Sequence, residues 1–317
     1  MSKILVDQAW RNKQMSGRFY EMTYAGATSF LRRPYSRELE GVDITVTGVP
    51  FDNAVTNRPG CRLGPRAIRA SSVELASLNS YPFGFDPFKF INVIDYGDCY
   101  LNTHNPSSIE KSIEEHAETI IQSGSKLLTF GGDHFISLPL LRAHVAKYGP
   151  VALLQFDSHC DTWEPQGPID HGTMFLTAIK EGLINVDQSI QVGLRTHNDL
   201  DVGIEVIDSR YIHSNGVDKT IKKIKSRIGN SKCYMTFDID FLDPAFAPGT
   251  GTPVCGGMAT WQALEFIRGL EDLDFIGMDL VEVSPPFDHA EITSMAAANI
   301  AHDWICIMAK KKKEKRL

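Results

Sequence analysis

The stretch VALLQFDSHCD, residues 151–161, runs from an apolar segment directly into a row of side chains that commonly bind metals. Asp157, His159 and Asp161 stand at every second position of this stretch. Because side chains alternate along a strand, all three are predicted to project from one face. Carboxylates this close repel one another unless a cation lies between them. The stretch therefore predicts a buried strand that ends in a cation site.

The bulk composition is that of a globular protein. The chain has 317 residues, of which 43% are hydrophobic and 22% charged, which is enough to bury a large core. A net charge of -7 argues against a nucleic-acid surface. No apolar run approaches the roughly 20 residues that span a bilayer, and the N-terminus does not resemble a signal peptide. The six scattered cysteines form no CxxC pair, so we expect reduced thiols and a cytoplasmic protein with no membrane partner.

Strand-like and helix-like segments alternate along the chain. Strands are expected at residues 44–50, 91–96, 126–130, 151–157, 190–194, 232–238 and 275–281. Helical patterns fall at residues 107–124, 138–146, 217–228, 260–270 and 291–309, and a further helix begins near Pro65. This alternation predicts a mostly parallel sheet with helices on both faces.

The domain organisation is predicted to be simple, because the sequence has no internal repeat and no linker-like change of composition. Residues 1–40 are polar and aromatic, and we expect them to form an arm that wraps the domain or a neighbouring subunit. Residues 41–309 are predicted to form one domain. The lysine-rich residues 310–317 are expected to be a solvated, frayed basic tail.

Further metal-binding side chains follow two other predicted strands. His134 comes just after the strand at residues 126–130, and Asp238 and Asp240, again two residues apart, end the strand at residues 232–238. Ligands bind open parallel sheets beyond the carboxyl ends of the strands. With the three residues of the opening stretch, six potential metal ligands are therefore predicted to meet at one edge of the sheet.

The charge of this cluster predicts how many cations it binds. Its four aspartates would be neutralised by two divalent cations, whereas one cation would leave the site strongly anionic. Four carboxylates and two imidazoles favour manganese and fit zinc less well. Two metals about 3.5–4 Å apart can share a water and lower its pKa. A single DxD or HxD pair would be interpreted as part of a surface loop or as a capping aspartate. Ligand residues at the ends of three predicted strands instead favour a binuclear metal site.

Several sequence blocks resemble a known family of enzymes. The blocks are GGDH at 131–134, DSHCD at 157–161, TFDIDFLDPAFAPGTGTP at 236–253 and VEVSPPFD at 281–288. They resemble the ureohydrolase family, which includes arginases and agmatinases. The likeness extends from GVPFD near residue 48 through the last predicted helix. Within the family it is closest to the agmatinases, especially through DHGTMF at 170–175.

The resemblance implies an arginase-like fold, a three-layer α/β/α sandwich, and two Mn²⁺ ions per subunit. It implies that Asp157 and Asp238 bridge both ions, that His134 and Asp161 complete one ion, and that His159 and Asp240 complete the other. The implied reaction is hydrolysis of a guanidinium group to an amine and urea by a metal-bridging hydroxide, which Asp161 orients. The resemblance further implies a homo-oligomer, a trimer or a hexamer.

The resemblance also suggests residues that contact the substrate. Glu282 is expected to pair with the guanidinium group, and His171 is expected to transfer a proton to the leaving amine. The leading substrate is agmatine, whose hydrolysis yields putrescine for polyamine synthesis, and Glu164 is a candidate to bind its ammonium end. Guanidinobutyrate and guanidinopropionate are the alternatives. Their carboxylates would need donors such as Arg58 or Asn57.

Two other classes of protein stay open at this stage. A binuclear phosphoesterase also uses aspartates and histidines, but the sequence contains no GNH[DE] element. A non-catalytic relative would conserve the fold without turnover, yet every expected ligand position is occupied by a ligand residue. An amidine hydrolase of the ureohydrolase family is therefore the leading hypothesis.

Overall fold

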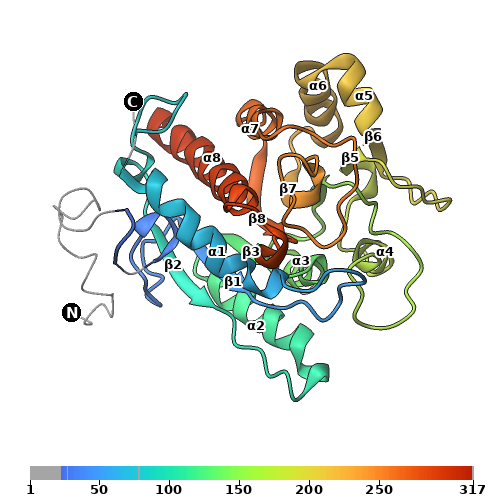
Figure 1. Cartoon of the computed structure of the whole chain (residues 1–317), viewed down its shortest axis with the longest axis horizontal. Coiled ribbons are helices and arrows are strands. Elements are labelled where there is room, and N and C mark those ends of the chain that lie inside the picture. Colours follow the sequence, from blue (N-terminus) through green and yellow to red (C-terminus); the bar gives the residue numbers. More distant parts are fainter. Residues whose placement is uncertain (1–22, 27, 78, 316–317) are drawn as a thin grey trace.

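The computed structural model describes residues 23–26, 28–77 and 79–315. Its centre is an eight-stranded sheet in the order β2-β1-β3-β8-β7-β4-β5-β6, and every neighbouring pair is parallel (Figure 1). The strands are β1 (Ile44–Val49), β2 (Val93–Asp98), β3 (Lys126–Gly131), β4 (Ala152–Phe156), β5 (Ile190–Leu194), β6 (Glu205–Asp208), β7 (Lys232–Asp238) and β8 (Asp274–Val281). The predicted parallel α/β fold is confirmed.

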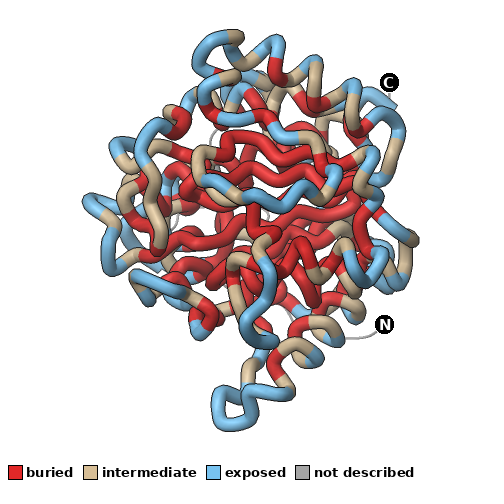
Figure 2. The backbone as a smooth tube through the Cα atoms, turned by 90° about the vertical axis from the view of Figure 1, so that its right-hand side faces the viewer, coloured by how far each residue is buried: buried red, intermediate tan, exposed pale blue. Residues whose placement is uncertain are grey.

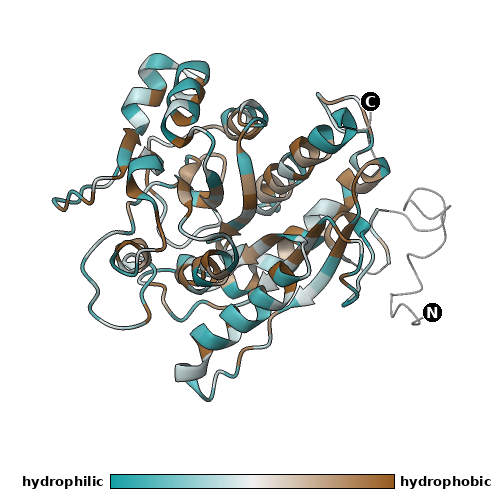
Figure 3. Ribbon diagram, turned by 180° about the vertical axis from the view of Figure 1, so that it is seen from behind, coloured by the Kyte–Doolittle hydropathy of each residue, from teal (hydrophilic) through white to brown (hydrophobic). Residues whose placement is uncertain are grey.

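Helices cover both faces of the sheet. They are α1 (Gly64–Ser71), α2 (Ile109–Gln122), α3 (Ser137–Tyr148), α4 (Met174–Lys180), α5 (Ser209–Asn215), α6 (Val217–Ile228), α7 (Thr260–Gly269) and α8 (Ile292–Glu314). One buried core lies between the sheet and α2–α4, and a second lies between the sheet and α1 with α5–α8. Figure 2 shows the strands buried between more exposed outer layers, and in Figure 3 hydrophobic colour gathers toward the sheet.

Strand β4 shows how the sequence pattern produces these two cores. Leu154 and Phe156 pack in the core that includes α8, whereas Leu153 packs in the core formed with α2–α4. Both faces of the strand are buried, as expected for a central parallel strand, so its sequence is apolar except for Gln155, whose buried amide donates to Asp157 at 2.8 Å. This burial on both sides fixes the strand, and therefore fixes where Asp157 leaves the sheet.

Several boundaries differ from the sequence-based expectations. Strand β2 begins at Val93 and ends at Asp98, two residues later than predicted. Strand β6, with four residues, and helices α4 and α5, with seven each, were not predicted. Segments this short carry too few turns of a periodic pattern to be recognised.

The basic C-terminal segment continues a helix instead of fraying. Helix α8 runs to Glu314. The Lys310 ammonium donates to both carboxylate oxygens of Glu271 at 2.7 and 2.8 Å, and Lys312 pairs with Asp43. The expectation of a frayed tail was therefore wrong for residues 310–314, because these ion pairs hold the last turns against the domain.

The predicted N-terminal arm lies partly outside the described residues, which begin at residue 23. From residue 28 onward the segment packs on the domain: Phe30 and Leu31 are fully buried, and the Phe30 amide donates to the Asp95 carboxylate at 2.8 Å. No helix among the described residues is both long and apolar enough to cross a bilayer.

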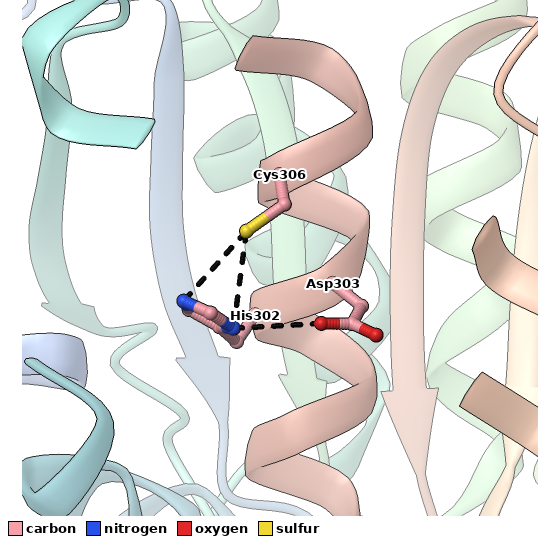
Figure 4. A group of neighbouring side chains, drawn as sticks. All are labelled: His302, Asp303 and Cys306. Atoms are coloured by element: carbon pink, nitrogen blue, oxygen red, sulfur yellow. Dashed lines mark hydrogen bonds and ion pairs between the residues drawn. The ribbon is translucent and has the colours of Figure 1, made fainter. Parts of the chain in front are cut away.

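Helix α8 carries a buried polar cluster of His302, Asp303 and Cys306 (Figure 4). The Asp303 carboxylate is paired with Arg268 of α7 at 2.7 Å, and the Cys306 thiol donates to the Ser80 hydroxyl at 3.1 Å. The guanidinium already neutralises the carboxylate, so a metal cation at Asp303 would be repelled by a neighbouring positive charge. We interpret this cluster as a packing contact that joins α8 to α7 and to the segment around Ser80.

Candidate active site

The six predicted metal ligands meet at the carboxyl edge of the sheet. They are His134 after β3, Asp157, His159 and Asp161 after β4, and Asp238 and Asp240 at the end of β7. Strands β3, β8, β7 and β4 are consecutive neighbours in the sheet, and Glu282 directly follows β8. Residues from four segments that are far apart in sequence therefore share one site.

Three carboxylates surround the imidazole of His134. Its Nδ1 atom lies 2.9 Å from Asp161 Oδ2, 3.1 Å from Asp157 Oδ2 and 3.3 Å from Asp238 Oδ2. All four side chains are almost completely buried. Despite these short distances, the buried Nδ1 atom makes no hydrogen bond. The geometry is that of ligand atoms which face a common centre.

A second group of ligand atoms surrounds His159. Its Nδ1 atom lies 3.0 Å from Asp240 Oδ2 and 3.6 Å from Asp157 Oδ1. Asp157 therefore belongs to both groups, with one carboxylate oxygen toward His134 and the other toward His159. The two possible cation positions share this aspartate.

The hydrogen bonds behind His134 show that the cluster fits a cation. Thr236 donates its hydroxyl proton to Asp279 at 2.5 Å, and the same hydroxyl oxygen lies 2.7 Å from His134 Nε2. A threonine has one hydroxyl proton, so His134 Nε2 must be the donor in the second contact. A neutral imidazole that is protonated at Nε2 presents a lone pair at Nδ1. That lone pair faces three carboxylate oxygens, an arrangement that a metal ion stabilises.

The pKa shifts express the same crowding of negative charge. Burial, together with Asp240 and Asp157, raises the pKa of Asp238 well above its ordinary value. Burial and Asp157 raise the pKa of Asp161 to about 6. Burial alone would lower the pKa of His159, but the nearby carboxylates of Asp240 and Asp157 outweigh burial and raise that pKa to about 12. Without cations, the cluster therefore retains protons in their place.

Glu282 and His171 form a pair beside the ligand cluster. Glu282 Oε1 accepts from the His134 amide at 2.9 Å and from His171 Nδ1 at 2.8 Å. The other oxygen, Oε2, is buried and has no hydrogen-bond partner within the described chain. A buried carboxylate oxygen without a hydrogen-bond partner destabilises the folded protein. A cationic donor such as a guanidinium group would satisfy this oxygen.

The hydrogen bonds of His171 define its tautomer. The Thr56 amide donates to His171 Nε2 at 3.2 Å, so the neutral ring accepts at Nε2 and carries its proton on Nδ1, toward Glu282. Burial lowers the pKa of the imidazole, but Glu282 outweighs this effect and raises it to about 9. A second proton on Nε2 would displace the Thr56 amide and be donated to the Thr56 hydroxyl, whose oxygen lies 3.0 Å from Nε2. The ring is therefore placed to take up and release one proton.

Two site residues have strained backbone conformations. Asp161 has φ of 50° and Glu282 has φ of 63°, although neither is glycine. Left-handed backbone costs about 1–3 kcal/mol at a bulky residue and persists where the surrounding structure enforces it. Here it turns both carboxylates toward His134, within reach of its ring and its amide.

A cavity of about 290 Å³ opens onto the cluster. It is lined by Thr56, His159, Asp161, Trp163, Glu164, Gln166, Asp170, His171, Gly172, Thr173, Asp238 and Thr252. A volume at the lower end of the range for ligand pockets suits a small substrate. Among the described residues, the lining contains several carboxylates and no lysine or arginine.

The structure places the predicted substrate residue Glu164 at the rim of this cavity. Its side chain is 68% exposed and forms an ion pair with Lys180 at 3.0 Å. Trp163 and Asp170, which also line the cavity, were not singled out from sequence. No spacing rule points to them, because the loop that carries them has no regular period.

Arg195, directly after β5, was also missed from sequence. Its guanidinium donates to the carbonyl oxygens of Asp240, Leu242 at 3.2 Å and Val254 at 2.9 Å, and its amide donates to the Ser158 carbonyl at 3.0 Å. Arg195 thereby joins the segments that carry the ligands after β4 and β7. An arginine that follows a strand has no distinctive local signal, so only the folded chain shows these contacts.

Replacing Arg195 with methionine is expected to weaken metal binding about 10- to 100-fold, because the carbonyls that hold the Asp240 segment lose their donors. The measurement is the Mn²⁺ dissociation constant, from the paramagnetic resonance signal of free Mn²⁺. Arg227→Met is the matched control, since Arg227 also donates to backbone carbonyls, those of Val186 and Gly203. Equal metal affinity in both variants and the wild type would contradict the positioning role of Arg195.

The fold and the cluster define a class of protein: an α/β enzyme with a carboxylate-rich candidate metal site. A family model described as the arginase family matches residues 42–306. An agmatinase of Chromobacterium violaceum is 57% identical over 309 residues, which cover 96% of each chain. An agmatinase of Escherichia coli O7:K1 is 46% identical over 293 residues, which cover 92% of this chain and 96% of that one.

A solved structure supports the same relationship. The crystal structure of a hypothetical agmatinase from Burkholderia thailandensis superposes with a TM-score of 0.91 at 54% sequence identity, covering 92% of this chain and 94% of that one. The protein therefore belongs to the arginase family, and it is an enzyme of the ureohydrolase type.

Proposed function

We propose that this enzyme hydrolyses agmatine to putrescine and urea with two Mn²⁺ ions. The observation that carries the proposal is the cavity itself, which, in the part of the chain that the structure describes, is lined by carboxylates of the candidate metal cluster, by further carboxylates and by no lysine or arginine. Such a cavity favours a small substrate that is cationic at both ends. The similarity to agmatinases along almost the whole chain supports the same substrate.

The residues that would hold the two ions are His134, Asp157, His159, Asp161, Asp238 and Asp240. Four carboxylates balance two divalent cations, and the oxygen-dominated donor set favours manganese. When bound, such a pair of ions lowers the pKa of water and stabilises negative charge that develops during hydrolysis. Asp161 is suited to accept a hydrogen bond from the attacking water and to orient it, since its carboxylate lies in both the cluster and the cavity.

Glu282 and His171 would act on the substrate itself. The unpaired Oε2 atom of Glu282 is available to a guanidinium N–H, and the negative charge strengthens that hydrogen bond. His171 lines the cavity and carries one exchangeable proton, so it can supply the proton that the leaving amine requires.

The residues proposed for acidic substrates are engaged elsewhere. The guanidinium of Arg58 lies over the ring of Phe287, 5.1 Å from the ring centroid. The side-chain amide of Asn57 donates to the Gly251 carbonyl at 3.2 Å. Neither side chain lines the cavity. A carboxylate at the far end of guanidinobutyrate or guanidinopropionate would meet carboxylates there, which disfavours both compounds.

A urea-release assay with Mn²⁺-loaded protein tests this assignment. The substrates are agmatine, guanidinobutyrate, guanidinopropionate and arginine at equal concentrations. We expect kcat/KM for agmatine to exceed that for each acidic compound by at least about 100-fold, because placing like charges together costs several kcal/mol. A preference for guanidinobutyrate would refute agmatine as the substrate. Absence of urea from all four would refute the activity.

A cytoplasmic location and assembly into a trimer or hexamer complete the proposal. All six cysteines are free, and five of them are buried, as expected for a protein kept in a reducing compartment. Light scattering coupled to size-exclusion chromatography measures the number of chains in solution, and a monomer of 35.3 kDa would refute the oligomer.

A further inference from the structure

Trp163 and Asp170 lie side by side around Gly172. A Cβ atom at Gly172 would lie 3.1 Å from Cε3 of the Trp163 ring and 3.5 Å from Asp170 Oδ1. The backbone fixes both neighbours: the Trp163 amide donates to the Gly172 carbonyl at 3.1 Å, and the Gly172 amide donates to Asp170 Oδ1 at 2.8 Å. The Trp163 backbone and the Asp170 carboxylate are thus both hydrogen-bonded to Gly172, and the indole ring lies against the same residue.

Both side chains belong to the wall of the cavity that opens onto the metal ligands. The Trp163 ring centroid lies 6.2 Å from that of His159, with the ring planes 60° apart. Asp170 directly precedes His171, whose ring contacts Glu282. The pair is therefore adjacent to the site of hydrolysis but takes no part in the ligand cluster.

Among the residues that the structure describes, no cationic side chain forms an ion pair with Asp170; Arg142, which lines a neighbouring cavity with it, pairs with Glu110 and Glu181 instead. The Oδ1 atom of Asp170 accepts from Gly172, and within the described residues its Oδ2 atom has no hydrogen-bond partner and no ion pair. Glu164 differs, because its carboxylate is paired with Lys180 and its side chain is 68% exposed. Of the carboxylates in this loop, Asp170 is the one free to balance a cation.

We propose that Trp163 and Asp170 form the subsite for the primary ammonium group at the far end of the substrate. The indole face attracts a cation through its quadrupole, and the carboxylate supplies a charged acceptor. The inference rests on the proposed hydrolysis of a cationic guanidine, and it assigns to this pair the role that the sequence suggested for Glu164. The subsite selects against substrates with an apolar or an acidic end.

The test compares agmatine with butylguanidine, which has the same guanidinium group and an apolar end. Asp170→Asn keeps the acceptor for the Gly172 amide while it removes the charge. We expect this variant to raise KM for agmatine about 10-fold or more, with kcat little changed, and to leave butylguanidine kinetics unchanged. Trp163→Leu should act in the same direction, and Trp163→Phe should recover part of the loss because a phenyl ring still attracts cations.

Asp199→Asn is the matched control, because Asp199 is an exposed aspartate outside this cavity that pairs with His197. The subsite is refuted if Asp170→Asn impairs agmatine and butylguanidine equally, since a structural defect would do the same. It is also refuted if Glu164→Gln, and not Asp170→Asn, produces the agmatine-specific loss, or if the wild type turns over both compounds with equal kcat/KM. Failure of the proposed function itself is distinct, because the wild type would then release no urea from either compound.

Discussion

Asp157→Ala is expected to abolish paired metal binding and to lower kcat by at least about three orders of magnitude. Asp157 is the residue that both groups of ligand atoms share, with one oxygen 3.1 Å from His134 Nδ1 and the other 3.6 Å from His159 Nδ1. Its loss removes a ligand from both positions at once. Metal content after dialysis, measured by mass spectrometry, and urea release are the two readouts.

Stability provides a readout of Asp157 that does not depend on activity. With saturating Mn²⁺, the wild type should melt at a higher temperature than the variant, since binding at 100 times Kd stabilises by about 2.7 kcal/mol. In a chelator, the difference in melting temperature should narrow but not reverse, because Asp157 also accepts hydrogen bonds from the Gln155 side chain at 2.8 Å and from the His159 amide at 2.6 Å. Burial alone would raise the pKa of Asp157, but His134 and His159 outweigh burial and lower that pKa. Asp157→Asn, which preserves the side-chain volume, should show the same narrowing.

The result that contradicts this assignment is equally clear. Asp157 would not belong to the metal site if the variant retained two ions per chain with wild-type turnover. The same would follow if the chelator left the melting temperature of the wild type unchanged. Asp218→Ala, at the N-terminal end of helix α6 and away from the cavity, is the control and should leave metal content unchanged.

Glu282→Gln is expected to lower kcat/KM by about 100-fold or more while both ions stay bound, a loss of about 3 kcal/mol in transition-state stabilisation. Glutamine keeps an oxygen for the His134 amide and for His171 Nδ1, which Glu282 Oε1 accepts at 2.9 and 2.8 Å. It replaces only the unpaired Oε2 atom, with an amide that cannot accept from a guanidinium group.

The Glu282 variant separates substrate binding from metal binding. Its metal content should equal that of the wild type and of the surface control Glu265→Gln, whose carboxylate pairs with Arg268 at 2.7 Å. Loss of an ion would instead assign Glu282 to the metal site. Unchanged kcat/KM with both ions present would leave the buried Oε2 atom without a function.

Much of the fold follows from local patterns. The largely apolar runs predicted the central parallel strands, and the pattern with Ile109, Ile113 and Ala117 predicted helix α2, where all three residues are buried. The edge strand β6 and the short helices α4 and α5 escaped prediction because each is too short to show its period. Ion pairs of Lys310 and Lys312 with distant acids, which no local pattern reveals, extended helix α8 beyond its predicted end.

The metal ligands could be found from sequence for a specific physical reason. Strand β4 ends at Phe156, so the strand end and the left-handed backbone at Asp161, rather than the predicted alternation, bring Asp157, His159 and Asp161 together. The rule that held is that parallel strands end at a common edge. That rule needs no knowledge of the strand order. The common edge predicted that Asp238 and His134 share a site, and in the structure Asp238 Oδ2 lies 3.3 Å from His134 Nδ1.

The sequence by itself determined that the opening stretch VALLQFDSHCD is a buried strand followed directly by ligand residues, because hydrophobicity acts over a few neighbouring positions. Only the tertiary structure decided which oxygen of Asp157 faces which histidine, that Glu282 retains an unpaired oxygen, and that Trp163 and Asp170 meet around Gly172. These contacts join residues from different loops and strand ends. Loop conformation depends on the packing of the whole chain, so it leaves no periodic signal in the sequence.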